Sequence, residues 1–272
     1  VLAENSQAGF AGIELGPVGF MPEDPIVLAE ALDEFEQELI GGVVFRPFHD
    51  PNQWDFVLDG AVRTCKSLTA HSARHLVLID SISPRRASTA GRFTDAVQMS
   101  KAEWKGFKDR IATIAKIGTE EYGLIVGIHA HAAGFIDFEP EIERLLEEID
   151  EKYLKICFDT GHHSYAGFDP TSFMRRYLQR ISYMHFKDIN PIVKADVIFK
   201  RTDFYTACGQ GIFCNLGDGD VDFETVRTLL IENDFNGWCT VEQDCDPEGK
   251  TSPLEDAKIN REYLESIGFK GV

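Results

Sequence analysis

The feature that most constrains this chain is a regular alternation of short apolar runs with longer amphipathic stretches. The runs are mostly continuous instead of alternating with polar residues, which is typical of parallel strands covered on both faces. The stretches between them have helical periodicity, and one opens with Ser100 and Glu103 in the spacing of a capping box. Strand and helix in succession predict an α/β fold with a parallel sheet. The seven predicted strands lie within residues 9–16, 39–48, 75–81, 124–131, 155–162, 180–188 and 237–244.

Chain length favours a single domain, a (β/α)8 TIM barrel that takes in residues 1–272. Such a barrel has eight strands and runs to about 250 residues, so one domain fits without a linker. Only seven strands are visible, and residues 1–10 have the pattern of the end of a helix. We therefore expect that the sequence lacks the first strand of the barrel and the start of its helix, roughly 20–40 residues by the usual repeat.

Charge and composition exclude several classes of protein. The chain has 27 basic and 45 acidic residues, a formal net charge of −18, and a surface this negative repels the phosphate backbone of nucleic acids. No stretch approaches the roughly 20 consecutive apolar residues of a membrane span. The six cysteines form no C-x-x-C pair, so we expect free thiols of a reducing compartment. These features predict a cytoplasmic protein that binds neither nucleic acid nor membranes.

Two connections between predicted elements are unusually long. One runs from Asp80 to Ser100 and the other from Asp188 to Asp222. Both follow a strand, and the carboxyl ends of the strands are where barrel enzymes build their active sites. Loops of this length are usually functional or disordered, and their aromatic residues favour ordered lids. The same aromatic residues are also consistent with a homo-oligomer in which the subunits close each other's sites.

Ionisable residues recur where the predicted strands end. A charged group buried at such a position needs compensation, and several of them converging on one axis predict a functional site. Mixed imidazole and carboxylate ligands suit Mn²⁺, Zn²⁺, Co²⁺ or Fe²⁺ better than Ca²⁺. We therefore predict a divalent metal site formed by His129 or His131 together with Asp159, His185 and Glu242.

Two further residues near these strand ends have two interpretations each. His162 follows Asp159 by three residues, so it could face the substrate or hydrogen-bond a metal ligand. Lys187 could act as a base or bind substrate beside the metal, or it could form a salt bridge with Asp159 or Asp188.

Glu14 and Arg46 are predicted to bind substrate hydroxyls, because each stands at the end of a predicted strand. Arg46 could equally pair with Glu14 or Asp80 inside the barrel. No G-x-G-x-x-G follows a strand and no G-x-S-x-G elbow occurs, so neither a dinucleotide site nor a hydrolase of that type is supported.

Five segments together resemble the xylose isomerase-like barrel superfamily: IHAHAAG, FDTGHHSYAGFDP, RISYMHFKD, GIFCNLGDGDVDF and GWCTVEQD. The order and the residues of these segments, together with LIGGVVFRPFHDPNQW in the N-terminal half, are most similar to the inosose dehydratase group of that superfamily. The superfamily holds its metal with Glu, Asp, His and Glu. The matching positions are His129, Asp159, His185 and Glu242, with a His in the first place. The His-x-His pair leaves open whether His129 or His131 is the ligand.

The resemblance implies a metal-dependent lyase that eliminates water from a polyhydroxylated ketone such as 2-keto-myo-inositol through an enediolate. The candidates for the catalytic base are His131, His162 and Lys187. Mn²⁺ or Co²⁺ is the expected metal, with Zn²⁺, Fe²⁺ and Mg²⁺ as alternatives. Reprotonation of the same enediolate would give a sugar isomerase or epimerase, the second hypothesis. A non-catalytic sugar-binding barrel is the third. The net charge argues against the related abasic-site endonucleases, which need a basic groove.

Overall fold

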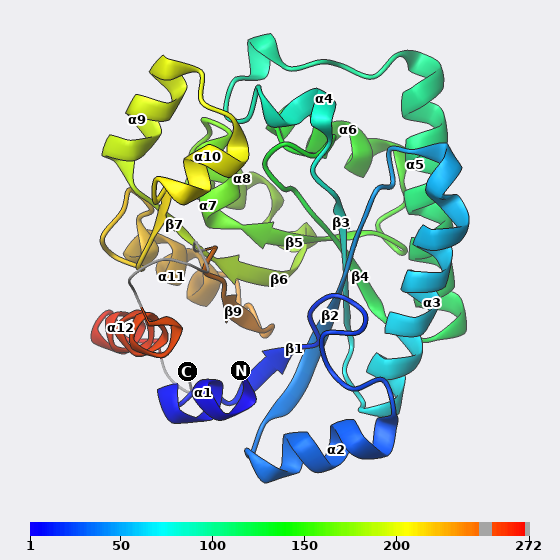
Figure 1. Ribbon diagram of the computed structural model, residues 1–272, viewed down its shortest axis with the longest axis vertical. Helices are drawn as coiled ribbons and strands as arrows, with labels where there is room; N and C mark the ends of the chain where they lie inside the picture. The colour runs from blue at the N-terminus through cyan, green and yellow to red at the C-terminus, as the bar shows by residue number, and fades with distance from the viewer. Residues whose placement is uncertain (245–251, 270–272) are drawn as a thin grey trace.

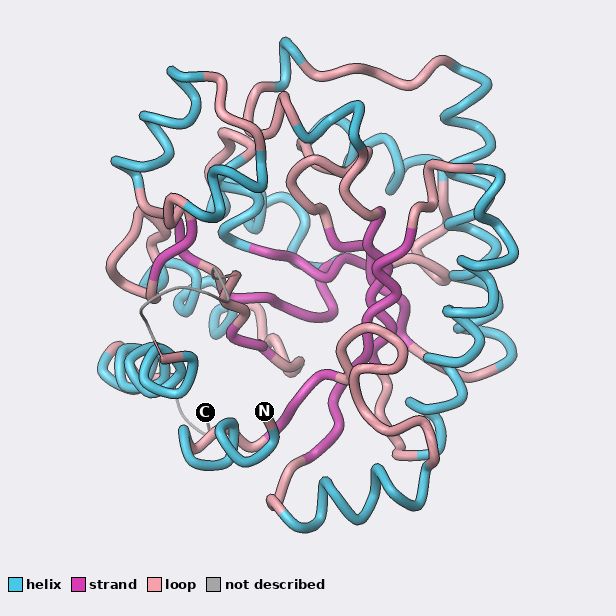
Figure 2. The backbone as a smooth tube through the Cα atoms, viewed as in Figure 1, coloured by secondary structure: helices cyan, strands magenta, loops and turns pink. Residues whose placement is uncertain are grey.

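The computed structural model describes residues 1–244 and 252–269. Its main sheet is parallel throughout, and the strands follow one another in the order β1-β2-β3-β4-β5-β6-β9. Helices surround the curved sheet (Figures 1 and 2), so the predicted TIM-barrel class is confirmed. The strands are β1 (Gly12–Glu14), β2 (Glu38–Arg46), β3 (His75–Asp80), β4 (Ile125–His129), β5 (Lys155–Asp159), β6 (Ile181–Phe186) and β9 (Cys239–Val241). Six of them lie wholly within one of the predicted runs, and β2 begins one residue before its run.

Most of the helices follow a strand and carry its chain back to the opposite end of the barrel (Figure 1). Their first turns are stabilised by side-chain caps: Ser100 and Glu103 form the predicted capping box, and Asp222 caps the last helix before β9. A cap of this kind contributes about 1 kcal/mol. The helices are α1 (Leu2–Ala8), α2 (Pro25–Glu34), α3 (Trp54–Ala70), α4 (Pro84–Ala87), α5 (Lys101–Lys116), α6 (Glu139–Glu148), α7 (Thr160–Tyr165), α8 (Pro170–Tyr177), α9 (Pro191–Lys200), α10 (Phe204–Gly209), α11 (Phe223–Glu232) and α12 (Pro253–Ser266).

Two apolar regions lie on opposite faces of the sheet. The larger one fills the space between strands and helices, and it includes Leu76, Val126 and Phe107. The smaller one includes Cys157 and Tyr183. Because side chains alternate faces along a strand, Cys157 and Tyr183 share a face with Asp159 and His185, two residues further along. The smaller region therefore forms the floor beneath the ionisable residues at the strand ends.

The two long connections are ordered, as predicted. The first contains α4 and the short 3-10 turn Phe93–Asp95. The second contains α9, α10 and a two-stranded antiparallel sheet of β7 (Asp188–Ile189) and β8 (Phe213–Cys214). The Asp188 carboxylate accepts hydrogen bonds from the backbone N–H groups of Ile189, Gly217, Gly219 and Val221, at 2.8–3.1 Å. This one side chain fixes the path of the chain that returns from the second connection.

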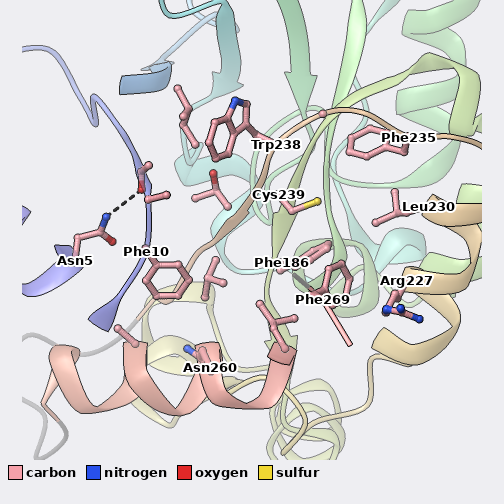
Figure 3. A pocket seen from close by; sticks show the side chains of 18 of the residues that line it. Asn5, Phe10, Phe186, Arg227, Leu230, Phe235, Trp238, Cys239, Asn260 and Phe269 are labelled. Atoms are coloured by element: carbon pink, nitrogen blue, oxygen red, sulfur yellow. Dashed lines mark hydrogen bonds between the residues drawn. The ribbon is translucent and has the colours of Figure 1, made fainter. Parts of the chain in front are cut away.

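The sheet is open between β1 and β9, its two edge strands within the described residues. A cleft of about 1120 Å³ lies there, lined by apolar and polar residues that include Phe10, Phe186 and Trp238 (Figure 3). None of the predicted site residues lines this cleft. The predicted further strand ahead of the seven remains a prediction.

Five of the six cysteines lie in the described part of the chain, and all five are free thiols: Cys65, Cys157, Cys208, Cys214 and Cys239. Cys245 lies outside the described residues. Across the same ranges, the structure contains no helix with the length and apolar character to span a membrane.

Candidate metal centre and the side chains around it

Four ionisable side chains meet at the carboxyl ends of neighbouring strands. His129 ends β4, Asp159 ends β5, His185 lies near the end of β6, and Glu242 directly follows β9. Parallel pairing aligns these ends, and Asp159 stands opposite His185 in the register. Each residue offers a ligand atom, and the four atoms lie within 4.8 Å of one another. The sheet topology therefore brings together four strand ends, of which the first and last, at His129 and Glu242, are more than 110 positions apart in the sequence.

The close contacts within this set are too few to satisfy its polar atoms. His129 Nε2 lies 3.5 Å from Asp159 Oδ2 and 3.8 Å from Glu242 Oε2, and His185 Nδ1 lies 2.5 Å from Glu242 Oε2. Even so, all four of these atoms lack a hydrogen-bond partner with good geometry among the described residues. Unpaired buried polar atoms are costly. Two imidazoles and two carboxylates whose unpaired atoms converge fit a divalent cation of the first transition series.

Neighbouring charges keep both carboxylates of this set ionised. Burial alone would raise the pKa of Glu242, but Lys187 and His185 hold that pKa well below its usual value. Burial likewise raises the pKa of Asp159, and the opposing effects of Lys187 and His129 lower it overall. An ionised carboxylate has only acceptor oxygens, which is the state that binds a cation.

Glu14 lies behind this set. Its Oε1 is 3.2 Å from Nε2 of His185, on the opposite side of the imidazole from Nδ1, which approaches Glu242. The contact with a carboxylate requires a proton on Nε2, so Nδ1, which faces the other ligand atoms, is the nitrogen that would bind a cation. Glu14 thus orients His185 in the way that carboxylates orient metal-binding histidines. Its predicted role in binding substrate remains a prediction.

The first three residues of the D-T-G-H segment after β5 each have a structural reason. Asp159 Oδ1 accepts a hydrogen bond from the N–H of His162 at 2.7 Å, which starts α7, while Oδ2 faces the ligand set. Thr160 Oγ1 bonds both the C=O and the N–H of Lys187, at 2.7 and 3.0 Å. Gly161 leaves room for Lys187, because a Cβ there would stand 2.6 Å from Lys187 Cγ.

A second group of side chains adjoins the four ligands. The ring centroids of His131 and His162 are 4.1 Å apart, and His162 Nε2 is 3.1 Å from Nζ of Lys187. The Nδ1 atom of His131 is 2.8 Å from the carbonyl oxygen of Ala132, which accepts its proton and leaves Nε2 as the acceptor nitrogen. Burial and the neighbouring His129 lower the pKa of His131 to about 4. His131 is therefore neutral near pH 7 and has an available lone pair.

Lys187 is fully buried, yet it remains charged. Burial alone would lower its pKa, but Asp244, Glu242 and Asp159 together raise the pKa above the usual value for lysine. His162 has a pKa far below its usual value because of burial and the nearby Lys187. Both nitrogens of His162 face donors, Lys187 on one side and the N–H of Ala132 at 3.2 Å on the other. A neutral imidazole accepts at only one nitrogen, so only one of these contacts can be a hydrogen bond at a time.

The second long connection covers this group with aromatic rings. Phe204 of α10 lies 5.5 Å from His131, measured between ring centroids, and Phe213 of β8 lies 5.1 Å from His162. Nζ of Lys187 is 4.8 Å from the centroid of Phe213. Both phenylalanines are almost completely buried. The predicted lid therefore lies directly over the residues proposed for proton transfer.

The structure does not bring Arg46 to the ligand set. Its guanidinium carbon lies 4.3 Å from the centroid of Phe56 on α3, and its Nε lies close to Gly60 of the same helix. Asp80 instead accepts hydrogen bonds from the backbone and ring of His49 and from the N–H of Phe135. The predicted substrate contact of Arg46 stays a prediction.

Asp244 belongs to the site but was not predicted from the sequence. Its Oδ2 lies 2.8 Å from Nζ of Lys187 and 3.7 Å from Nε2 of His162. The signal was present in the spacing, because Glu242 and Asp244 are two residues apart and side chains at this spacing share a face in extended chain. The sequence alone does not show that the chain stays extended after β9.

Comparison with known proteins agrees with this architecture. The model of the xylose isomerase-like TIM barrel family matches residues 2–267. The chain belongs to this family. The inosose dehydratase of Geobacillus kaustophilus (strain HTA426) is 31% identical over 275 residues, which cover 98% of this chain and 86% of that protein. The predicted resemblance is confirmed.

Solved structures share the fold at lower sequence identity. The probable 3-DHS dehydratase AsbF of Bacillus anthracis has a TM-score of 0.73 and 18% identity, covering 97% of this chain and 92% of its own. An L-ribulose 3-epimerase has a TM-score of 0.72 and 15% identity, covering 98% and 86%. These relatives show that the chain is an enzyme of the dehydratase or isomerase/epimerase type. All four residues of a set that could hold a metal ion are present, so the incomplete ligand set that would favour a non-catalytic barrel is not observed among the described residues.

Proposed function

We propose that this enzyme is a divalent metal-dependent hydro-lyase that removes water from a polyhydroxylated ketone such as 2-keto-myo-inositol. The observation that carries the proposal is the position of the His131–His162–Lys187 group directly beside the four-residue ligand set. The relatives named inosose dehydratase point to the substrate.

His129, Asp159, His185 and Glu242 would hold the metal, with Mn²⁺ or Co²⁺ expected. When bound, the metal would supply Lewis acidity that stabilises negative charge on the carbonyl oxygen of the substrate. The floor of buried apolar side chains and the aromatic rings over the histidines shield part of this site from water, and electrostatic interactions are stronger where water is absent.

We assign the base to His131 and the acid to Lys187. Nε2 of His131 takes the proton from the carbon next to the ketone, and the electrons of that C–H bond form the enediolate of the substrate. The C–O bond to the β-hydroxyl then breaks, and Lys187 donates the proton with which that group leaves as water. His131 is neutral with a free acceptor nitrogen, and Lys187 is charged with three donor hydrogens, so each group is in the state that its role needs.

The isomerase or epimerase alternative is less well supported by the side chains around the ligand set. Two further acidic residues, free to exchange protons with a substrate, would favour it. The nearby carboxylates are instead engaged, Glu14 with His185 and Asp244 with Lys187.

The test is an activity assay on 2-keto-myo-inositol with chelator-treated enzyme, following the ultraviolet absorbance of the diketone before and after addition of Mn²⁺ or Co²⁺. Restored absorbance supports the proposal. His131→Asn should abolish elimination, whereas His71→Asn, which lies at the end of α3, should leave it unchanged. Exchange of the α-proton with deuterated water and no diketone with any metal would refute the lyase and identify an isomerase.

A further inference from the structure

A second set of metal-binding residue types lies next to the first. His131, His162 and Asp244 each offer one ligand atom, and these atoms lie within 4.8 Å of one another. Both histidines are buried and Asp244 is partly buried. Two imidazoles and one carboxylate make up a common three-residue ligand set for zinc and related ions. By composition and spacing, this group could hold a cation of its own.

The ammonium group of Lys187 already stands in this set. Nζ of Lys187 lies 2.8 Å from Oδ2 of Asp244 and 3.1 Å from Nε2 of His162. It also lies 3.4 Å from Glu242 Oε1 and 3.7 Å from Asp159 Oδ2. The lysine side chain is completely buried. The nitrogen therefore contacts ligands of both sets, as a cation between them would.

Charge balance gives a reason for this arrangement. The two sets together contain the carboxylates of Asp159, Glu242 and Asp244, because their other members are histidines. One lysine and one divalent ion balance three carboxylates. A second divalent ion would leave excess positive charge beside the completely buried ammonium group of Lys187, which is costly.

We infer that Lys187 is a built-in cation that fills the His131–His162–Asp244 set and takes the place of a second metal ion there. This chain would accordingly bind one divalent ion in the His129–Asp159–His185–Glu242 set and none in the second. Removal of the lysine side chain would open the second set to a metal. The inference concerns occupancy alone, and the reaction proposed above is not needed for it.

The experiment counts bound zinc. Wild-type protein, Lys187→Ala and Lys187→Arg are stripped with chelator, dialysed against Zn²⁺ and assayed for zinc per chain by mass spectrometry. Lys187→Ala should bind one ion more than wild type. Lys187→Arg keeps a positive charge and should show no gain, and Lys66→Ala on the exposed face of α3 controls for zinc bound to the acidic surface. The double variant Lys187→Ala/Asp244→Ala should lose the additional ion.

A folded Lys187→Ala protein that gains no zinc would overturn the inference, with folding verified by circular dichroism. A second comparison does not require that variant to fold. Asp244→Ala should bind as many ions as wild type, and a loss of one ion would show that the second set holds metal despite Lys187. The gain is always measured against wild type. A wild-type protein without bound zinc would therefore count against the metal-dependent lyase. The zinc gained by Lys187→Ala relative to wild type would still show whether Lys187 takes the place of a second metal ion.

Discussion

Glu14→Gln tests whether the carboxylate behind His185 serves the metal or the substrate. The structure shows one contact between Glu14 Oε1 and His185 Nε2, at 3.2 Å. His185 is buried and the Glu14 side chain is 14% exposed. If this contact fixes the imidazole, the neutral amide should weaken metal binding and leave the four ligand residues in place.

The size of the effect follows from the type of contact. A hydrogen bond to a charged group contributes about 1.5–3 kcal/mol, and loss of such a partner of a metal-binding histidine lowers metal affinity about 10–100-fold. Glutamine still has an acceptor oxygen of the same shape, and Glu14 retains some access to water. We therefore expect the lower end of this range, about tenfold, which corresponds to about 1.4 kcal/mol.

The assay is isothermal titration of chelator-treated protein with Mn²⁺. Glu23→Gln is the matched control, because Glu23 is half exposed and pairs with Arg63 on the surface. That variant should bind Mn²⁺ as wild type does. An unchanged Mn²⁺ dissociation constant in Glu14→Gln, together with a raised KM, would refute the argument and support the predicted contact of Glu14 with substrate.

Three further predictions concern stability. Burial raises the pKa of Asp137 to about 7, against the opposing effect of Arg86. The folded chain therefore binds more protons than the unfolded chain between about pH 4 and 7. As pH rises through that window, the contribution of Asp137 to the free energy of unfolding falls by up to about 1.4 kcal/mol per pH unit. The free energy of unfolding, measured with urea at pH 5–8, should depend less steeply on pH in Asp137→Asn than in wild type or Asp33→Asn. An equal pH dependence in all three proteins would contradict this prediction. Asp188→Ala leaves the backbone N–H groups of Gly217, Gly219 and Val221 without their acceptor and should lower the free energy of unfolding in urea by about 3 kcal/mol or more. A loss no larger than that caused by the exposed Asp218→Ala would contradict this prediction. Mn²⁺ at about 100 times its dissociation constant should stabilise the protein by about 2.7 kcal/mol and raise Tm by about 5–10 °C; calorimetry that shows the same rise for Asp159→Asn would place the metal elsewhere.

Some features of this protein were determined by the sequence alone. The seven strands could be predicted because continuous apolar runs and amphipathic helices are local patterns, and a covered parallel sheet is the structure that satisfies both. The capping box at Ser100 is likewise encoded within four residues. The prediction that His129 or His131 lies beside Asp159, His185 and Glu242 needed only the knowledge that parallel strand ends meet at one edge of the sheet.

Other features were decided only by the tertiary structure. Glu14 is 171 positions from His185, and Asp244 is 57 positions from Lys187, so neither contact has a local signal. Arg46 ends its strand as Glu14 does, yet its side chain lies on α3 because the two side chains point to opposite faces of the sheet. Which side chain faces the barrel axis depends on register and bulges, such as the shift between Ile13 and Glu14, and these are set by packing between strands that the sequence does not place beside each other.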